Sequence, residues 1–167
     1  MRRMPGGRFR RVVPSPAPVQ ILELPQIARL VEADELVIAC GGGGIPVVPS
    51  NSDGYVGVAA VVDKDLASSL LAVGLGAEVM FLLTNVEHVY RDFGTLHAEP
   101  LRQLTVSQAK SLLADGQFPS GSMGPKITAA ISFLEATPAA DPKVILTSCD
   151  AVLEAASGTT GTMITRG

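Results

Sequence analysis

Apolar residues along this chain follow two periods, one typical of strands and one typical of helices. Apolar runs predict strands at residues 36–40, 47–48, 55–62, 79–83, 143–147 and 162–165, with a further extended segment at 11–13. The run at 79–83 contains no polar residue, which is expected of a strand covered on both faces. The turn sequence Asn-Ser-Asp-Gly at 51–54 predicts a hairpin between 47–48 and 55–62.

Helix-spaced apolar residues fill the intervals between most of these strands. Pro25 suits the first turn of one helix, Asp63 caps the next, and a capping box begins at Thr105. A further helix follows a loop at 116–124, and a short one covers about 151–156. This alternation predicts an α/β domain whose mostly parallel sheet is flanked by helices on both faces.

Composition supports one soluble domain and excludes several classes of protein. The 167 residues are 47% hydrophobic and only 4% aromatic, so the core is expected to be aliphatic. A net charge of −3 gives no basic surface for nucleic acid. The arginines near the start precede no apolar stretch and are not a signal peptide, and the region 66–86 contains Glu78 and parses as a helix and a strand. We therefore expect a cytoplasmic protein that does not bind a membrane.

The cysteines and histidines give no sign of a disulfide framework or a zinc site. Cys40 and Cys149 lie far apart in the sequence, and His88 and His97 lack the spacing of metal ligands.

A run of four glycines follows the predicted strand 36–40: Gly41, Gly42, Gly43 and Gly44. Unshielded N–H groups at the carboxyl end of a strand can form an anion-binding concavity. A dinucleotide fingerprint or a Walker loop would need a helix directly after the glycines, whereas Pro46 and the valines after it favour another extended segment. A flexible turn remains the alternative.

Two lysines stand at the starts of predicted helices, where the helix dipole disfavours them unless they face an anion. Lys64 lies in Asp63-Lys64-Asp65, whose first aspartate is explained as a cap. Lys126 ends a glycine-bearing loop into a helix, a pattern typical of phosphate sites. An ordinary cap and an exposed lysine are the alternatives.

The segment after the predicted strand 79–83 is a third candidate. Residues that follow a central parallel strand line the ligand crevice of open α/β folds, and Tyr90 could border a flat base. Considered alone, this segment fits a surface turn with a partly buried tyrosine better.

The order of these segments resembles the carbamate kinases of the amino acid kinase family. The matching text comprises residues 10–16, the glycine run with 45–48, residues 63–68, Thr84 with Val89 and Tyr90, and residues 121–126. The resemblance extends from Arg10 to about Ile164 and corresponds to the carboxyl-terminal half of such an enzyme. It implies a three-layer αβα fold in which residues 1–9 are a basic lead and 10–167 are the nucleotide-binding half.

The resemblance also implies a reaction and a set of roles. The reaction is reversible phosphoryl transfer between ATP and carbamate, giving ADP and carbamoyl phosphate, with Mg²⁺ as cofactor. The expected catalytic residues are Lys64, Asp65 and Lys126. The expected nucleotide-binding residues are Thr84, Tyr90, Gly121, Ser122 and Met123. The expected substrate and phosphate loop is Gly41, Gly42, Gly43, Gly44 and Ile45.

The chain departs from the family pattern because it matches only one half of such an enzyme. The other half, with its own phosphate loop, has no counterpart, so we expect a homodimer or a partner chain that supplies it. Asn85 replaces a common acidic residue or glycine, and Ala59 replaces a common glutamate. A non-catalytic adenine-nucleotide-binding module, or a structural α/β domain, are the competing interpretations.

Overall fold

A four-stranded mixed sheet forms the centre of the molecule. The computed structural model describes residues 2–3, 6–7, 9–10, 12–51 and 54–167. The sheet contains β5 (Val79–Thr84), β9 (Lys143–Ser148), β10 (Thr162–Thr165) and β8 (Gln103–Thr105), in that spatial order. β5 pairs parallel to β9 and β10 pairs parallel to β8, while β9 and β10 are antiparallel. The mostly parallel α/β sheet predicted from the sequence is confirmed.

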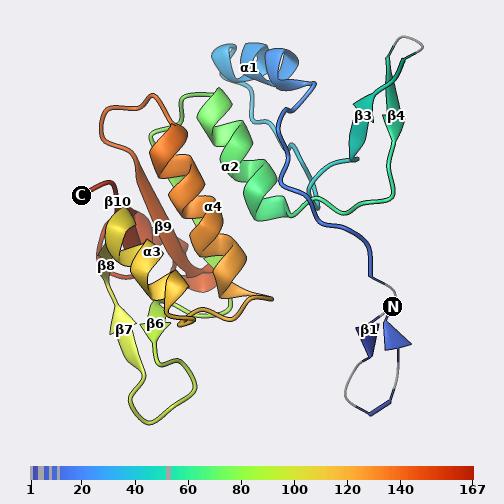
Figure 1. Cartoon of the computed structure of the whole chain (residues 1–167). Helices are drawn as coiled ribbons and strands as arrows, with labels where there is room; N and C mark the ends of the chain where they lie inside the picture. The colour runs from blue at the N-terminus through green and yellow to red at the C-terminus, as the bar shows by residue number, and fades with distance from the viewer. Residues whose placement is uncertain (1, 4–5, 8, 11, 52–53) are drawn as a thin grey trace.

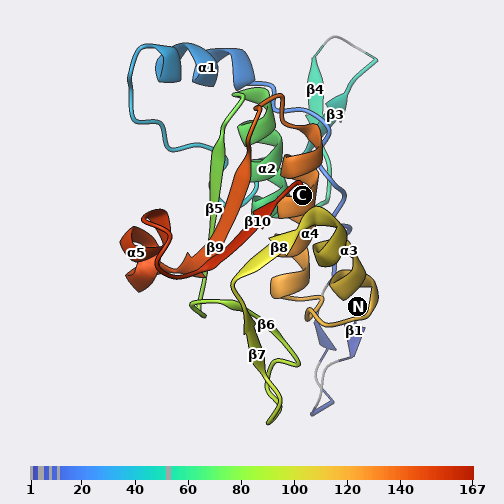
Figure 2. The same ribbon diagram turned by 90° about the vertical axis from the view of Figure 1, so that its left-hand side faces the viewer.

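Helices cover the two faces of this sheet unequally (Figures 1 and 2). One face carries α2 (Lys64–Gly74), α3 (Val106–Ala114) and α4 (Met123–Ala136). The other carries the short α5 (Val152–Ala156), which follows a 3₁₀ turn at Cys149–Ala151. The remaining helix, α1 (Leu24–Glu32), lies across the top of the molecule and has no buried residue. The second helical layer is thus represented by little more than α5.

The core lies between the sheet and the large helical layer. Its fully buried side chains are mainly aliphatic, as composition predicts: Ile127, Leu134, Val144, Leu146 and Ile164, joined by Phe133. α4 supplies several of them because apolar residues recur along it at helical spacing. The burial of these groups fixes α4 on the sheet and positions its amino-terminal turn.

Local capping signals place the starts of α2 and α3 as predicted. The Asp63 carboxylate accepts hydrogen bonds from the N–H groups of Asp65 and Leu66 at 2.8 and 3.3 Å. Thr105 and Gln108 form the complete capping box of α3. These caps satisfy first-turn N–H groups that have no partner inside the helix.

Three small hairpins extend from the main body. β3 (Val47–Pro49) pairs with β4 (Tyr55–Gly57), which ends earlier than the predicted 55–62. Their connecting turn includes residues 52–53, which lie outside the described residues. β6 (Val89–Arg91) and β7 (Glu99–Leu101) form a hairpin that the sequence analysis did not predict. It did not predict the sheet strand β8 either.

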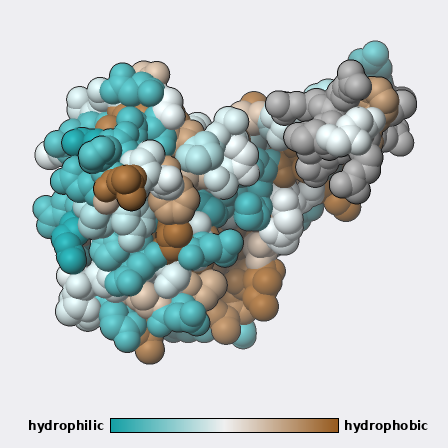
Figure 3. All heavy atoms as spheres, turned by 90° about the horizontal axis from the view of Figure 1, so that it is seen from below, coloured by the Kyte–Doolittle hydropathy of each residue, from teal (hydrophilic) through white to brown (hydrophobic). Residues whose placement is uncertain are grey.

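The third hairpin lies at the amino terminus and joins β1 (Arg2–Arg3) to β2 (Phe9–Arg10). Figure 1 shows β1 apart from the main body, and in the view from below hydrophobic side chains gather in patches on the body itself (Figure 3). In the extended segment predicted at 11–13, residue 11 lies outside the described residues and 12–13 form no strand.

The prediction of a strand at residues 36–40 is wrong. This segment has irregular backbone, and the side chains of Leu36 and Ile38 are each 95% exposed. Cys40 has a φ of 63°, and the Gly41 N–H donates to the carbonyl of Ala39, so the turn begins before the predicted strand ends. Apolar residues form a strand only beside a neighbour that pairs with their backbone, and no described strand pairs with this segment.

The prediction that 79–83 is covered on both faces is also wrong. Met80 and Leu82 are buried, whereas Val79, Phe81 and Leu83 are 37%, 37% and 41% exposed. β5 is an edge strand of the sheet, and α5 does not extend over its outer face.

Within the described residues, no helix is both long and apolar enough to span a membrane.

Candidate active site

The amino-terminal turns of α2 and α4 meet beside the carboxyl ends of β5 and β9 (Figure 1). The two helices pack against each other along the same face of the sheet. Asp65 lies in the first turn of α2 and Lys126 in the first turns of α4. Residues 61 positions apart in the sequence therefore come together at the edge where α/β folds bind ligands.

Asp65 is the centre of a charged cluster. Its two carboxylate oxygens accept hydrogen bonds from the Lys126 Nζ at 3.0 and 3.1 Å. The Lys64 Nζ lies 3.4 Å from Oδ2 of the same carboxylate. The structure thus brings together Lys64, Asp65 and Lys126, the three expected catalytic residues, while their catalytic roles stay a prediction.

The two lysines differ in exposure. The side chains of Asp65 and Lys126 are 9% and 12% exposed, whereas that of Lys64 is 58% exposed. Within the cluster one carboxylate faces two ammonium groups, because the adjacent Asp63 carboxylate is engaged by the N–H groups of Asp65 and Leu66. A positive cluster at two helix amino termini favours an anionic ligand, because the helix dipoles add to the attraction.

The glycine run packs against the start of α2. A Cβ atom added to Gly43 would lie 2.1 Å from the carbonyl oxygen of Val62 and 3.4 Å from the carbonyl carbon of Asp63. Gly43 is also held at a φ of 132°, which side-chain-bearing residues rarely adopt. This close approach places the run within a few residues of Asp65, in agreement with a single site.

The backbone of the run is only partly free to bind a ligand. The N–H groups of Gly41 and Gly43 donate to carbonyls of Ala39 and Cys40, each at 2.8 Å. Those of Gly42 and Gly44 have no acceptor among the residues that the structure describes. The anion-binding interpretation thus has two available donors, and Ile45 beyond them is 87% exposed.

A cavity of about 300 Å³ opens between the end of β5 and the start of α4, and its lining residue Met123 lies one helical turn before Lys126. Four of the five residues predicted to bind nucleotide line it: Thr84, Tyr90, Ser122 and Met123. Gly121 is exposed and is not among the lining residues. Asn85, where the family pattern differs, lines it as well.

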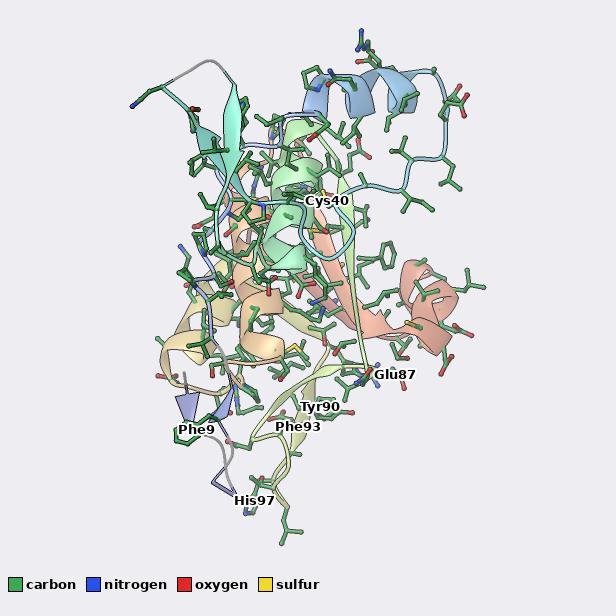
Figure 4. All side chains as sticks on the ribbon, turned by 90° about the vertical axis from the view of Figure 1, so that its right-hand side faces the viewer. Phe9, Cys40, Glu87, Tyr90, Phe93 and His97 are labelled. Carbon is green, nitrogen blue, oxygen red and sulfur yellow. The ribbon has the colours of Figure 1, made fainter. Side chains whose placement is uncertain are left out.

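Two aromatic walls of this cavity were missed by sequence reasoning. Phe93 contacts Tyr90 with ring centroids 5.7 Å apart, and both rings lie on the β6–β7 side of the cavity (Figure 4). Phe118 forms part of another wall and is buried. Gln117 is fixed by hydrogen bonds with the backbone and side chain of Asp92 at 2.8 and 3.2 Å. These residues come from irregular segments, where no periodicity marks a binding wall.

The site offers few ligands for a metal ion. No group of three or more His, Cys, Asp or Glu side chains lies close enough to hold one within the described ranges. The only carboxylate of the charged cluster, Asp65, is already bound to Lys126. Mg²⁺ often binds proteins through one or two carboxylates together with the phosphates of a bound nucleotide. The residues of this site fit Mg²⁺ only if phosphate oxygens supply most of its ligands.

Comparison with known proteins agrees with this geometry. The sequence profile of the amino acid kinase family matches residues 3–148. The chain therefore belongs to the amino acid kinase family.

Among the similar curated proteins are carbamate kinases from Halobacterium salinarum and Staphylococcus haemolyticus. The first is 46% identical over 156 residues, which cover 93% of this chain and 50% of the relative. The second is 45% identical over 159 residues, covering 95% and 50%. The chain spans about half the length of the curated relatives that it matches.

A solved structure shows the same fold. The carbamate kinase of Giardia lamblia, determined with AMP-PNP bound, superposes with a TM-score of 0.87 at 40% identity. The match covers 93% of this chain and 53% of the Giardia chain. The half-length resemblance predicted from the sequence is confirmed.

Proposed function

We propose that this chain is the nucleotide-binding half of a carbamate-kinase-type phosphotransferase. The observation that carries the proposal is the Lys64–Asp65–Lys126 cluster beside a cavity with aromatic walls. The similarity to carbamate kinases, one of which was determined with an ATP analogue, supports the same assignment. In this proposal residues 10–167 form the nucleotide-binding half and 1–9 precede it.

The cavity and the cluster would hold different parts of the nucleotide. Tyr90, Met123 and Phe118 offer apolar surface to the adenine ring. The amino terminus of α4 and the Lys126 ammonium would attract the phosphates. Exposed Lys64 would neutralise oxygens of the transferred phosphoryl group, and Asp65 would hold the lysines in place.

The glycine run would border the second substrate. The N–H groups of Gly42 and Gly44 have no acceptor in the described part of the chain, and Gly43 fixes the run against α2. Carbamate and the transferred phosphate would approach these donors, since phosphoryl transfer depends on positioning and on neutralising oxygens. Mg²⁺ would supply further neutralisation when it is bound with the nucleotide.

We expect the chain alone to bind nucleotide but to turn over carbamate slowly. The carbamate oxygen must approach the terminal phosphate in line, and this half supplies donors on one side of the transferred group. Positioning can contribute roughly 7–11 kcal/mol, so losing even half of it would slow the reaction by several orders of magnitude. A second copy of the chain, or a partner chain, would have to supply the other side.

The direct test is ATP formation from carbamoyl phosphate and Mg-ADP. The purified chain should be nearly inactive, and adding a polypeptide with the unmatched half of the Halobacterium salinarum relative should raise the rate. Lys126→Ala should abolish the gain, whereas Lys110→Ala, which alters an exposed ion pair on α3, should not. Full activity of the chain alone would refute the inference of incompleteness, and no gain on complementation would count against the reaction.

A non-catalytic nucleotide-binding module remains the second candidate, favoured by the half-length match. Both candidates need the cavity and Lys126, but only catalysis needs free N–H groups in the glycine run. Substituting Gly42, which has no positive φ and open space around it, by Pro removes one of these donors. This change should lower the complemented rate with little effect on nucleotide affinity if the chain is catalytic.

A further inference from the structure

A second cavity, of about 340 Å³, lies on the face of the sheet opposite the charged cluster. Its floor is formed by strands β8, β9 and β10 and its wall by the loop 157–161 that follows α5 (Figure 2). Ile145, Ala155 and Met163 give it apolar surface. Nothing in the proposed kinase reaction uses this cavity.

Two basic side chains line the cavity without a counter-charge. Arg102 precedes β8, and Lys143 begins β9. Neither side chain makes an ion pair or hydrogen bond with any residue in the described part of the chain. No acidic residue lines the cavity. Two unpaired cations at one depression favour an anionic ligand.

The loop beside these cations adds backbone donors. Gly158 and Gly161 have φ angles of 80° and 81°, which glycine tolerates and which are found in loops whose successive N–H groups bind anions. The N–H groups of Thr160 and Gly161 have no acceptor among the described residues. Next to Gly161, the hydroxyl of Thr147 is buried and also lacks a partner there.

The loop is held in place before any ligand binds. The hydroxyls of Ser157 and Thr159 donate to the carbonyl of Glu154 at 2.8 and 2.9 Å. The Thr160 hydroxyl donates to the carboxylate of Glu87, the acidic group that reaches this loop. A preorganised loop loses little conformational entropy when a ligand binds.

We propose that this cavity is a second ligand site, which takes a small organic phosphate. Two cations, together with two N–H groups that no described residue accepts from, match the charge of a dianion better than they match the single charge of a carboxylate. The apolar floor would accommodate the organic part of the molecule, which inorganic phosphate lacks.

A ligand bound at this second site would change the conformation of the nucleotide cavity. Only this coupling rests on the proposed function. Glu87 lies three residues beyond the end of β5 (Figure 4), next to Val86, which lines the nucleotide cavity. The Thr160–Glu87 hydrogen bond therefore joins the wall of one cavity to the wall of the other. A ligand that shifts the loop at Thr160 would shift the segment at Val86 as well.

Phenyl phosphate is the probe that tests the site, with inorganic phosphate and benzoate as the other arms. The amide resonances of Thr160 and Gly161 are followed by NMR in the Lys126→Ala chain, so that phosphate binding at the first site is suppressed. We expect saturable shifts that are strongest with phenyl phosphate and weakest with benzoate. The double variant Arg102→Ala/Lys143→Ala should weaken binding about tenfold or more, since it removes two charge-assisted contacts.

Lys110→Ala, which removes a positive charge elsewhere on the surface, serves as the control and should leave the shifts unchanged. Absence of saturation, or equal affinity in the double variant, would overturn the site. For the coupling, phenyl phosphate should also shift the Asn85 and Val86 amides, and Thr160→Val should remove that effect. Equal shifts at Val86 in Thr160→Val would refute coupling through the Glu87 bond.

Discussion

Asp65 has one carboxylate and two lysines beside it, and the two contacts differ in exposure. The contact with Lys126 is nearly buried, while Lys64 is largely solvated. Removal of Lys126 would leave a buried carboxylate with only a weak partner. Lys126, which would bind phosphate in the proposed function, therefore also holds α4 to α2 through its ion pair with Asp65.

We predict that Lys126→Met lowers the free energy of unfolding by about 2 kcal/mol or more, because breaking a buried ion pair leaves a charge uncompensated. The matched control is Lys110→Met on α3, whose pair with Glu135 is about half exposed. That change should cost less than about 1 kcal/mol. Urea denaturation of both variants measures the difference, and equal losses would mean that Asp65 does not depend on Lys126.

Cys40, directly before the glycine run, reports on the charge around that run. Burial raises the pKa of its thiol, and the nearby Glu23 carboxylate raises this pKa further. A higher pKa leaves less thiolate at pH 8, and the thiolate is the reactive form.

In a Cys149→Ser background, Glu23→Gln should therefore lower the pKa of Cys40 and speed its alkylation by iodoacetamide at pH 8. Glu35→Gln, which removes an exposed carboxylate nearby in the sequence, should leave the rate unchanged. A pH–rate profile gives the pKa directly. No shift in Glu23→Gln would show that burial alone acts on the thiol.

At the scale of elements, the turn of the glycine run depends on one close backbone contact. Gly43→Ala would force a Cβ into the carbonyl of Val62 at an unfavourable φ, whereas Gly42 has open space around it and no positive φ. We expect Gly43→Ala to cost about 2 kcal/mol or more and Gly42→Ala less than about 0.5 kcal/mol.

Thermal unfolding, with hydrogen exchange at the Asp65 and Leu66 amides, measures the effect of these two substitutions. Faster exchange is expected only in Gly43→Ala, because the clash displaces the residues that precede α2. Equal behaviour of the two variants would mean that the run does not pack against α2 in solution.

The elements that the sequence predicted correctly are those determined by nearby residues. The caps at Asp63 and Thr105 act within three or four positions, so their signals are readable without the rest of the fold. The segment 36–40 has the composition of a strand but requires a neighbour that no described element provides. β7 was missed because Pro100 in a three-residue strand argues against a strand, and a two-stranded hairpin tolerates it.

The candidate site divides in the same way. Lys64, Asp65 and Lys126 were found because each lies in a short ordered motif at a helix start. Phe93 and Phe118 belong to loops, and only the folded chain shows that they line one cavity. The pairing of Gln117 with Asp92 has no local signal either, because 25 positions separate the two residues.

At the scale of the whole molecule, apolar surface is open where one layer of helices is thin. Phe81 and Leu83 on β5 are part of that surface, and among the described strands only β9 pairs with the backbone of this edge strand. Exposed apolar patches and open strand edges promote association.

We predict that the chain self-associates or binds a fluorescent dye specific for apolar surface, and that Phe81→Lys reduces either effect. Leu96→Lys, which alters a fully exposed leucine in the β6–β7 loop, is the control and should have little influence. Light scattering and dye fluorescence provide the measurement. A strictly monomeric chain without dye binding would contradict the prediction that another polypeptide covers the surface around Phe81 and Leu83.

The central claim is that the cavity and Lys126 together bind an adenine nucleotide, and calorimetric titration with Mg-ADP tests it most directly. We predict saturable binding at the cavity beside Lys126, weakened about tenfold or more in Lys126→Ala, because a charged hydrogen bond to phosphate is lost. Lys110→Ala should bind like the unaltered chain, and circular dichroism should show that both variants are folded. Absence of binding by the unaltered chain, or equal affinity in a folded Lys126→Ala chain, would contradict the account.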